Sequence, residues 1–218
     1  MLRARPGLQQ RSRESFEAVL AAAESLLSEQ LFEEVGMADI ARRAGVAVGT
    51  LYQRFPSKEA LVPALFERHN AVVGRRIMSL FSHLASESSL RRRIDLVVGF
   101  AVDYHVRHRG LLRTLTTYVR ANPSVASDAL FAEREAVYSD VARRMLDGEP
   151  GTVPADRLDA ALFALGLINS VCREQILFGD VSPLSRRRGQ STDLKRKLGD
   201  VVECALARRT SSQPSRRS

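Results

Sequence analysis

The chain has 218 residues, of which 44% are hydrophobic and 27% are charged, and this composition is ordinary for a globular protein with one or two domains. No run reaches the roughly 18 consecutive apolar residues that a membrane-spanning helix needs. No apolar segment follows the basic N-terminus either, so we expect neither a membrane partner nor a secretory signal, and predict a cytoplasmic protein.

The formal net charge of +8 is spread unevenly along the chain. Residues 1–60 contain equal numbers of acidic and basic residues, whereas 61–120 and 181–218 are basic. Four arginines nevertheless precede the first acidic residue, Glu14, and these are Arg3, Arg5, Arg11 and Arg13. Residues 1–11 are therefore interpreted as a basic arm, for which contact with nucleic acid and a solubilising role are equally good explanations.

The hydrophobic periodicity predicts helices almost throughout. A first helix is expected over 12–29, followed by short helices over 37–44 and 48–55. Ser57 is a suitable N-cap for a long helix that ends near Phe81, and Pro63 is expected to bend this helix. Five more helices are predicted between segments rich in glycine and proline, over 89–107, 110–121, 124–147, 155–179 and 191–209.

Residues 36–55 have the features of a helix-turn-helix motif. Ile40 belongs to a small apolar face on the first short helix, which permits close crossing by a second helix. Gly45 stands where that helix must end, and glycine tolerates the left-handed conformation of such a cap. Leu51 and Phe55 are four residues apart and can anchor the second helix to the core. A second helix displayed in this way fits the major groove of DNA.

The residues in and around this motif resemble the TetR family of bacterial regulators. The resemblance extends from Arg13 to Phe66 and rests on three segments in the same order and spacing, Asp39-Ile-Ala-Arg-Arg-Ala-Gly-Val46, Gly49-Thr-Leu-Tyr52 and Phe55-Pro-Ser-Lys-Glu-Ala-Leu61. It implies an all-α protein of about nine helices, in which a three-helix DNA-binding domain over 12–60 precedes a helical ligand-binding and dimerisation domain over 61–210. The tail over 211–218 is expected to be disordered.

The functional expectation is a transcriptional regulator that binds double-stranded DNA at a pseudo-palindromic operator. The resemblance implies a homodimeric repressor on the bacterial nucleoid that responds to a small-molecule effector. The alternative is an architectural or protein-interaction module that keeps the helix-turn-helix without an effector. An enzyme is not expected, because no phosphate-binding loop or nucleophile motif is present, and no cofactor is predicted.

The resemblance also assigns DNA contacts by position, to Gly36, Ala47, Val48, Thr50, Tyr52, Gln53, Arg54 and Lys58. Lys58 would hold a phosphate together with the N-terminus of the long helix. Gly36 and Ala47 stand where the family usually has hydroxyl residues, and Val48 replaces a frequent lysine. We therefore expect weak non-specific binding and a shallow dependence of DNA affinity on salt.

Two further sets of residues are assigned to the C-terminal part. Apolar stripes on its last two helices are candidates for the dimer interface, although an internal core explains them nearly as well, and they comprise Leu158, Leu162, Leu165, Ile168, Leu194, Leu198 and Val201. Polar residues that interrupt apolar helices are candidates for a ligand pocket between the middle helices. Each of them alone is also explained by a solvent-facing side chain. These residues are Tyr104, His105, Thr114, Thr117, Tyr118, Asn169 and Arg173.

No further functional site is predicted for the cysteine, histidine and arginine residues of the sequence. Cys172 and Cys204 are expected to be reduced thiols, with a redox-sensing pair as the less favoured alternative. His105 and His108 are three residues apart on one helix, but a third ligand is missing, so no metal site is predicted. The arginine run over 91–93 is expected to be solvated charge.

Overall fold

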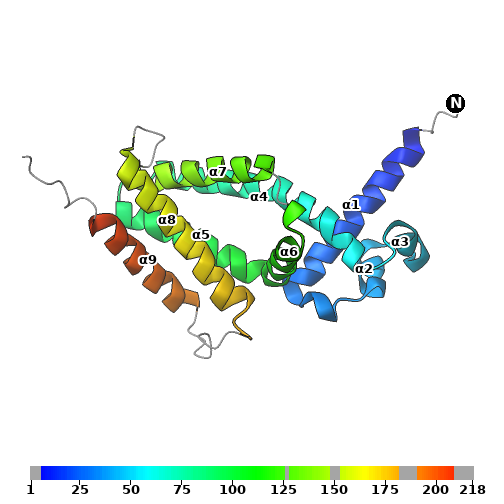
Figure 1. Cartoon of the computed structure of the whole chain (residues 1–218). Helices are drawn as coiled ribbons and strands as arrows, with labels where there is room; N and C mark the ends of the chain where they lie inside the picture. Colours follow the sequence, from blue (N-terminus) through cyan, green and yellow to red (C-terminus); the bar gives the residue numbers. More distant parts are fainter. Residues whose placement is uncertain (1–5, 126–127, 148–152, 182–190, 209–218) are drawn as a thin grey trace, which may run out of the picture. The chain divides into compact units, whose positions relative to one another are not determined.

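The computed structural model describes residues 6–125, 128–147, 153–181 and 191–208 (Figure 1). Within these ranges the regular structure is entirely helical, with nine α-helices and no strand. The predicted all-α class is therefore confirmed. Arg3, Arg5 and the predicted tail over 211–218 lie outside the described residues.

The chain divides into two compact units, which are described separately. Unit 1 comprises residues 1–72 and 107–122, and unit 2 comprises residues 73–106 and 123–218. The boundary lies inside helix α4 (Val62–Ala85), and helix α6 (Arg109–Ala121) belongs to unit 1. This division differs from the predicted boundary at residue 60, because the sequence pattern did not reveal that α6 packs on the first helix.

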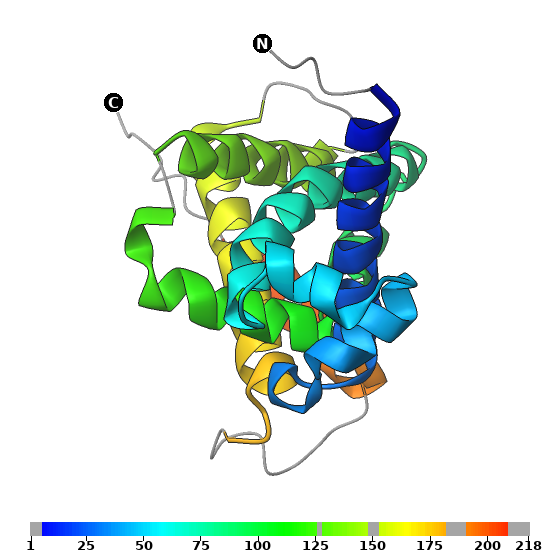
Figure 2. The ribbon, with the colours of Figure 1, turned by 90° about the vertical axis from the view of Figure 1, so that its right-hand side faces the viewer.

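Unit 1 is built around helix α1 (Pro6–Glu29), which is drawn in dark blue in Figure 2. The helix begins six residues before the predicted start, because proline is tolerated in a first helical turn, where its missing N–H has no intrahelical partner. Gln10 then donates a hydrogen bond to Glu14 one turn later, at 3.1 Å. The predicted basic arm is therefore helical from Pro6 onward.

The other elements of unit 1 are short. They are the 3-10 turn η1 (Phe32–Glu34), helix α2 (Met37–Ala44), helix α3 (Val48–Arg54) and the 3-10 turn η2 (Glu59–Leu61), after which α4 begins. The expected bend at Pro63 is wrong, because α4 starts at Val62 and the proline therefore lies in its first turn, where no hydrogen bond is lost.

Helix α6 lies against the C-terminal end of α1 through a glycine. A Cβ atom added at Gly110 would be 2.3 Å from the carbonyl oxygen of Gln30 and 2.4 Å from that of Leu27. Only glycine permits this separation of the two backbones. Leu111, which follows this glycine, and Leu115, one turn further along α6, belong to the buried residues of the unit.

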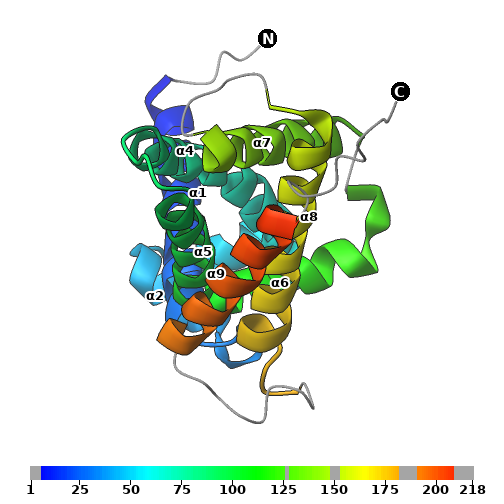
Figure 3. The same cartoon turned by 90° about the vertical axis from the view of Figure 1, so that its left-hand side faces the viewer.

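Unit 2 contains the rest of α4, helix α5 (Leu90–Arg107), helix α7 (Asp128–Asp147), helix α8 (Ala155–Cys172), which continues as a π-helical turn over Arg173–Leu177, and helix α9 (Ser191–Arg208). Helices α8 and α9 run side by side (Figure 3). All five helices contribute side chains to one apolar core, with Leu84, Val98, Met145, Ile168 and Val202 among its most buried members.

Segment Ala155–Leu177 is long and apolar enough to cross a membrane by length and composition. A core helix of a helical bundle meets the same criteria, because it is apolar on most sides. One side of α8 packs in the core of unit 2, through Ala160, Ala161, Ala164, Leu165, Ile168 and Cys172. We therefore interpret this segment as the core helix of unit 2.

Two of the three arginines over 91–93 are structural, so the expectation that the run is solvated is wrong. The Arg93 side chain is 6% exposed and donates hydrogen bonds to the carbonyl oxygens of Met145 (2.9 Å), Leu146 (2.5 Å) and Glu87 (2.8 Å). Carbonyls at the end of a helix have no intrahelical partner, and Arg93 supplies donors for those of α7. Only Arg92 keeps a largely exposed side chain.

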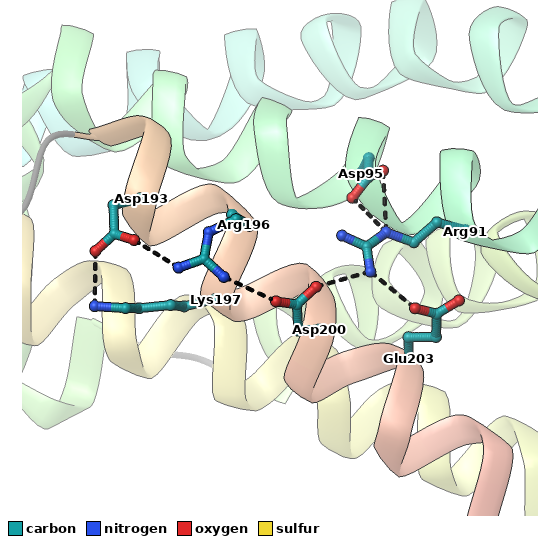
Figure 4. A network of polar contacts seen from close by, with 7 residues as sticks. All are labelled: Arg91, Asp95, Asp193, Arg196, Lys197, Asp200 and Glu203. Carbon is teal, nitrogen blue, oxygen red and sulfur yellow. Dashed lines mark hydrogen bonds and ion pairs between the residues drawn. The ribbon is translucent and has the colours of Figure 1, made fainter.

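Arg91 of α5 bonds to three carboxylates, one on its own helix and two on α9. Its guanidinium donates hydrogen bonds to Asp95 at 3.1 Å, and to Asp200 and Glu203 at 2.8 Å each (Figure 4). These bonds raise the pKa of Arg91, with that to Glu203 as the largest cause. The network continues along α9 through Arg196, Asp193 and Lys197. A shared network of this kind fixes the register of α9 against α5.

Candidate nucleic-acid interface

Helix α2 has a defined stop. Gly45 adopts the left-handed conformation with φ of 69° and ψ of 28°, and among the described residues it is the one glycine with such a φ. Its N–H donates to the carbonyl of Arg42, and the N–H of Val46 donates to that of Ala41 at 3.0 Å. This pair of bonds is a Schellman motif, and it confirms the predicted cap. The chain is thereby turned sharply into α3.

Helix α3 presents an outer side and anchors an inner one. Leu51 is 1% exposed and Phe55, just after the helix, is 6% exposed, as their spacing predicts. Val48 and Tyr52 are 42% and 49% exposed. Thr50 and Gln53 are exposed beside them. Apolar, aromatic, hydroxyl and amide groups therefore lie together on the outer side of one short helix.

The N-termini of both short helices lack side-chain caps. Gly36 and Ala47 hold the N-cap positions of α2 and α3 in extended conformations, and neither offers a hydroxyl. A side chain at Gly36 would also crowd the Asp39 carboxylate, which lies 3.0 Å from the position of a Cβ. No cap side chain occupies the first N–H groups of either helix, so these groups can donate hydrogen bonds to a phosphate.

Two of the predicted DNA contacts are already bonded within unit 1. Arg54 donates hydrogen bonds to Ser12 of α1. The Lys58 amine donates to the carbonyl oxygen of Phe32 at 2.6 Å and lies 4.6 Å from the centre of the Phe32 ring. Lys58 stands at the N-terminus of the 3-10 turn η2, which leads directly into α4. Each side chain keeps N–H donors that these bonds do not use, but the bonds set the direction in which it points.

Helices α2 and α4 are held to α1 by ion pairs that sequence reasoning missed. Arg43 of α2 contacts Glu29 at 2.8 Å and Ser25 at 2.7 Å. Its hydrogen bond is the main cause of a lowered pKa of Glu29. Arg68 of α4 contacts Glu24 at 3.1 Å, and Glu17 as well. No local spacing signals these pairs, because the partners are distant in sequence.

The predicted ligand residues fall into two groups. Three of them line a cleft of about 380 Å³ in unit 1, called here the α6 cleft. Its lining residues are Phe32, Glu33, Glu59, Val62, Arg113, Thr114, Thr117, Tyr118, Ala121 and Asn122. Thr114 donates a hydrogen bond to the carbonyl of Gly110, and the Tyr118 ring lies 6.2 Å from that of Phe66.

The other four predicted ligand residues belong to unit 2 and do not line the α6 cleft. His105 is buried, its Nδ1 is 2.8 Å from the Ala101 carbonyl, and burial is the main cause of its lowered pKa. The Tyr104 ring stacks on Phe100. Asn169 and Arg173 bond within their own helix, to Leu165 and Ser170 respectively.

The predicted dimer stripe lies mostly in the core of the chain itself. Leu165, Ile168 and Leu198 are buried in unit 2, and Leu158, Leu162 and Leu194 are partly buried against its core. A side chain that is already buried loses no further area in a dimer, so the first three cannot drive association. Val201 is 51% exposed, and Phe163, which the stripe omitted, is 71% exposed.

Metal and thiol chemistry finds little support among the described residues. No group of three His, Cys, Asp or Glu side chains is placed there to hold a metal ion. Cys172 is buried, and burial raises the pKa of its thiol to about 12, whereas Cys204 is exposed. A buried thiol with so high a pKa is a poor nucleophile.

Comparison with known proteins covers most of the chain. The family described as "Bacterial regulatory proteins, tetR family" matches residues 19–65. The chain is 34% identical over 207 residues to the HTH-type transcriptional repressor KstR of Mycolicibacterium smegmatis, covering 93% of this chain and 91% of that protein. The match to KstR of Mycobacterium tuberculosis is 36% identical over 143 residues, covering 63% of this chain and 61% of that protein.

Solved structures share the fold at lower sequence identity. A TetR-family regulator from Mesorhizobium loti has a TM-score of 0.62 at 19% identity, covering 90% of this chain and 97% of that one. The relatives named here are transcriptional regulators. The chain therefore belongs to the tetR family of bacterial regulatory proteins and is a helix-turn-helix regulator of transcription.

Proposed function

We propose that the protein is a homodimeric repressor that binds a pseudo-palindromic operator and releases it when a small molecule binds. The observation that carries this proposal is the exposed side of α3, held on a buried scaffold by Leu51 and Phe55. Relatives named as repressors support the direction of regulation. None of the relatives' names favours an architectural module.

The side chains of α3 suit direct readout of bases. Gln53 can donate to and accept from adenine in the major groove, and Val48 can contact a thymine methyl group. The Tyr52 hydroxyl can bond to a base edge, whereas the Thr50 hydroxyl and the uncapped first turns of α2 and α3 can bind phosphate oxygens. We assign specificity to Val48, Tyr52 and Gln53, and backbone contact to Thr50, Gly36 and Ala47. The protein would act in the cytoplasm, on the nucleoid.

A homodimer is proposed because two half-sites need two recognition helices at a fixed spacing, one helical turn of DNA or a multiple of it apart. Phe163 of α8 and Val201 of α9 are the large exposed apolar side chains on the two helices whose apolar stripes are candidates for the interface. Leu158, Leu162 and Leu194 are only partly buried and would lose their remaining exposed area there. We therefore centre the interface on Phe163.

The α6 cleft is our proposed effector site. Its volume is at the lower end of the range of small-molecule pockets, about 300–1,000 Å³. Phe32 and Val62 give it an apolar side, and Thr117 and Tyr118 give it hydrogen-bonding groups. Phe32 is also the partner of Lys58, so an effector that moves Phe32 would disturb a side chain assigned to DNA. Such coupling requires the effector to prefer one of two states.

Selection of binding sites from genomic DNA with the purified protein tests the DNA-binding part of the proposal. We expect enrichment of a pseudo-palindrome, and its loss with Tyr52→Ala while the oligomeric state stays unchanged. Absence of any enriched sequence would reject a specific repressor. Loss of the dimer with Tyr52→Ala would mean that this side chain serves packing instead.

Occupation of the α6 cleft is tested with a tryptophan that fills it. Thr117→Trp is compared with Ser82→Trp, an exposed position on α4 that does not line the cleft. A compound found by screening for release of the wild-type protein from its operator should fail to release the Thr117→Trp variant. Equal release of both variants would place the effector site elsewhere.

A further inference from the structure

Arg54, the last residue of α3, makes its contacts on α1. Its Nη1 donates a hydrogen bond to the carbonyl oxygen of Ser12 at 2.9 Å, and its Nη2 donates to the Ser12 hydroxyl. The guanidinium carbon also lies 5.3 Å from the centre of the Phe16 ring. Phe16 in turn stacks on Phe55, with ring centres 5.8 Å apart. Two adjacent residues at the end of α3 are therefore joined to the same stretch of α1.

This arrangement uses the particular geometry of arginine. The planar guanidinium offers parallel donors, and Ser12 offers two acceptors, its carbonyl and its hydroxyl. A lysine has one amine and cannot reproduce the fork. Since Ser12 is uncharged, the positive charge of Arg54 is not neutralised, but two of its donors are already occupied.

The Arg54 contact stabilises helix α3, which is too short to be stable by itself. Helix α3 has seven residues and no side-chain cap at its N-terminus, and a helix this short is not stable without tertiary contacts. Within the helix Leu51 is its one buried side chain, and Phe55 follows its end. The contact of Arg54 with α1 holds the C-terminal end of α3, so it limits fraying of that end and rotation of the exposed side of the helix. Fixing α3 before DNA arrives lowers the entropy lost on binding.

We propose that Arg54 is a positioning residue for DNA recognition, which ties the end of α3 to Ser12 and Phe16 of α1, and is not itself a phosphate contact. The proposal rests on the proposed function, because it takes α3 to be the recognition helix. It replaces the DNA contact that the resemblance assigned to Arg54.

The first measurement needs no DNA. Backbone hydrogen exchange of α3 is compared among the wild type, Arg54→Gln, Arg54→Lys and Ser12→Ala, with Ser12→Thr as the matched control that keeps both acceptors. We expect amide exchange at the end of α3 to rise about tenfold with Arg54→Gln and Arg54→Lys, and to rise less with Ser12→Ala, which keeps the carbonyl. Exchange should be unchanged with Ser12→Thr. Unchanged exchange in both Arg54 variants would overturn the proposal.

The second measurement separates positioning from phosphate contact. Affinity for the duplex enriched by binding-site selection is followed over a range of salt concentrations. A positioning role predicts that Arg54→Gln and Arg54→Lys each weaken binding about tenfold without changing the salt slope, and that adding Ser12→Ala to Arg54→Gln costs nothing more. A phosphate contact predicts a slope lower by about one for Arg54→Gln, recovery with Arg54→Lys, and additive losses. That second pattern would overturn the proposal.

The two measurements distinguish a failure of the proposed repressor function from a failure of the positioning role of Arg54. If no duplex is enriched but α3 exchanges faster in the Arg54 variants, the proposed repressor function is rejected and the tie between α3 and α1 is supported. If a duplex is enriched but exchange is unchanged, the repressor function stands and the positioning role is rejected.

Discussion

The contact between α6 and α1 can be tested by adding one methyl group at Gly110. A Cβ there would lie 2.4 Å from the backbone carbonyl oxygen of Leu27 in α1 and 2.3 Å from that of Gln30, just after the helix, and neither oxygen can rotate away as a side chain does. An ordinary carbon–oxygen contact is about 3.3 Å, so α6 must move by about 1 Å. Overpacking of this kind costs about 3 kcal/mol, and alanine regains at most about 1 kcal/mol as a helix former, which leaves a loss of about 2 kcal/mol.

Two other glycines provide the controls for Gly110→Ala. Gly74→Ala in α4 places its methyl group in open space and should stabilise the protein by about 0.5–1 kcal/mol. Gly199→Ala in α9 meets the Asp95 carboxylate at 2.9 Å, and that side chain can rotate, so the change should be close to neutral. Urea unfolding followed by circular dichroism, at one protein concentration because a dimer is proposed, gives the three values.

From the most to the least stable variant, the expected order is Gly74→Ala, Gly199→Ala and Gly110→Ala. The net loss for Gly110→Ala corresponds to a decrease in Tm of about 4–8 °C in a protein of this size. Because the α6 cleft lies along the same helix, effector response should also change in Gly110→Ala. The reasoning is refuted if Gly110→Ala is as stable as Gly74→Ala, since the two helices would then not be in backbone contact.

Four further predictions concern the interface, the buried arginine, an ion pair and the thiols. Phe163→Asp should convert the dimer to a monomer in a sedimentation experiment. Tyr138→Asp, which changes an exposed aromatic residue on α7, should leave the dimer intact. If both variants remain dimeric, Phe163 does not belong to the interface. Arg93→Met should lower the free energy of unfolding by about 3 kcal/mol because two buried carbonyls and one partly buried carbonyl lose their donors, and a change below about 1 kcal/mol would contradict that role. The pKa of Glu29 is lowered in the folded state, so its pairing with Arg43 stabilises the protein at pH values above the ordinary pKa of 4.5, and this contribution is lost as the pH falls through the folded pKa. The difference in unfolding free energy between the wild type and Glu29→Gln should therefore shrink in acid. A difference that grows in acid would contradict the prediction. In a Cys204→Ser variant, Cys172 should resist alkylation at pH 8 until the protein is unfolded, and rapid labelling of the folded protein would show that this thiol is accessible.

Local sequence signals predicted the helix-turn-helix well. Gly45 was identified as a cap because a sharp turn after a short helix needs a left-handed residue, and the structure has it there. Leu51 and Phe55 were placed in the core by their spacing, and both are buried. In each case the cause lies within a few residues of the effect. The DNA contacts assigned from the resemblance stay predictions.

Features that depend on distant partners were not predictable from the sequence. Arg54 and Lys58 look like available cations in a sequence, but their partners Ser12 and Phe32 are 42 and 26 residues away. The predicted dimer stripe includes three residues that are buried in unit 2, Leu165, Ile168 and Leu198, for a related reason. Helix α8 is apolar on most sides, so periodicity did not show which side faces the core and left Phe163 unassigned. Pro63 was misread because the start of α4 was placed too early.

The charge network between α5 and α9 has a consequence for how this chain can change during evolution. Asp200 accepts hydrogen bonds from both Arg91 and Arg196, so one substitution there removes bonds to two cations. Arg91 likewise serves three carboxylates, and its loss would leave them to repel one another. Gly199 leaves room for these groups between the helices. A single replacement within the network removes several bonds at once, so we expect substitutions there to occur as compensated pairs, with charges exchanged between α5 and α9.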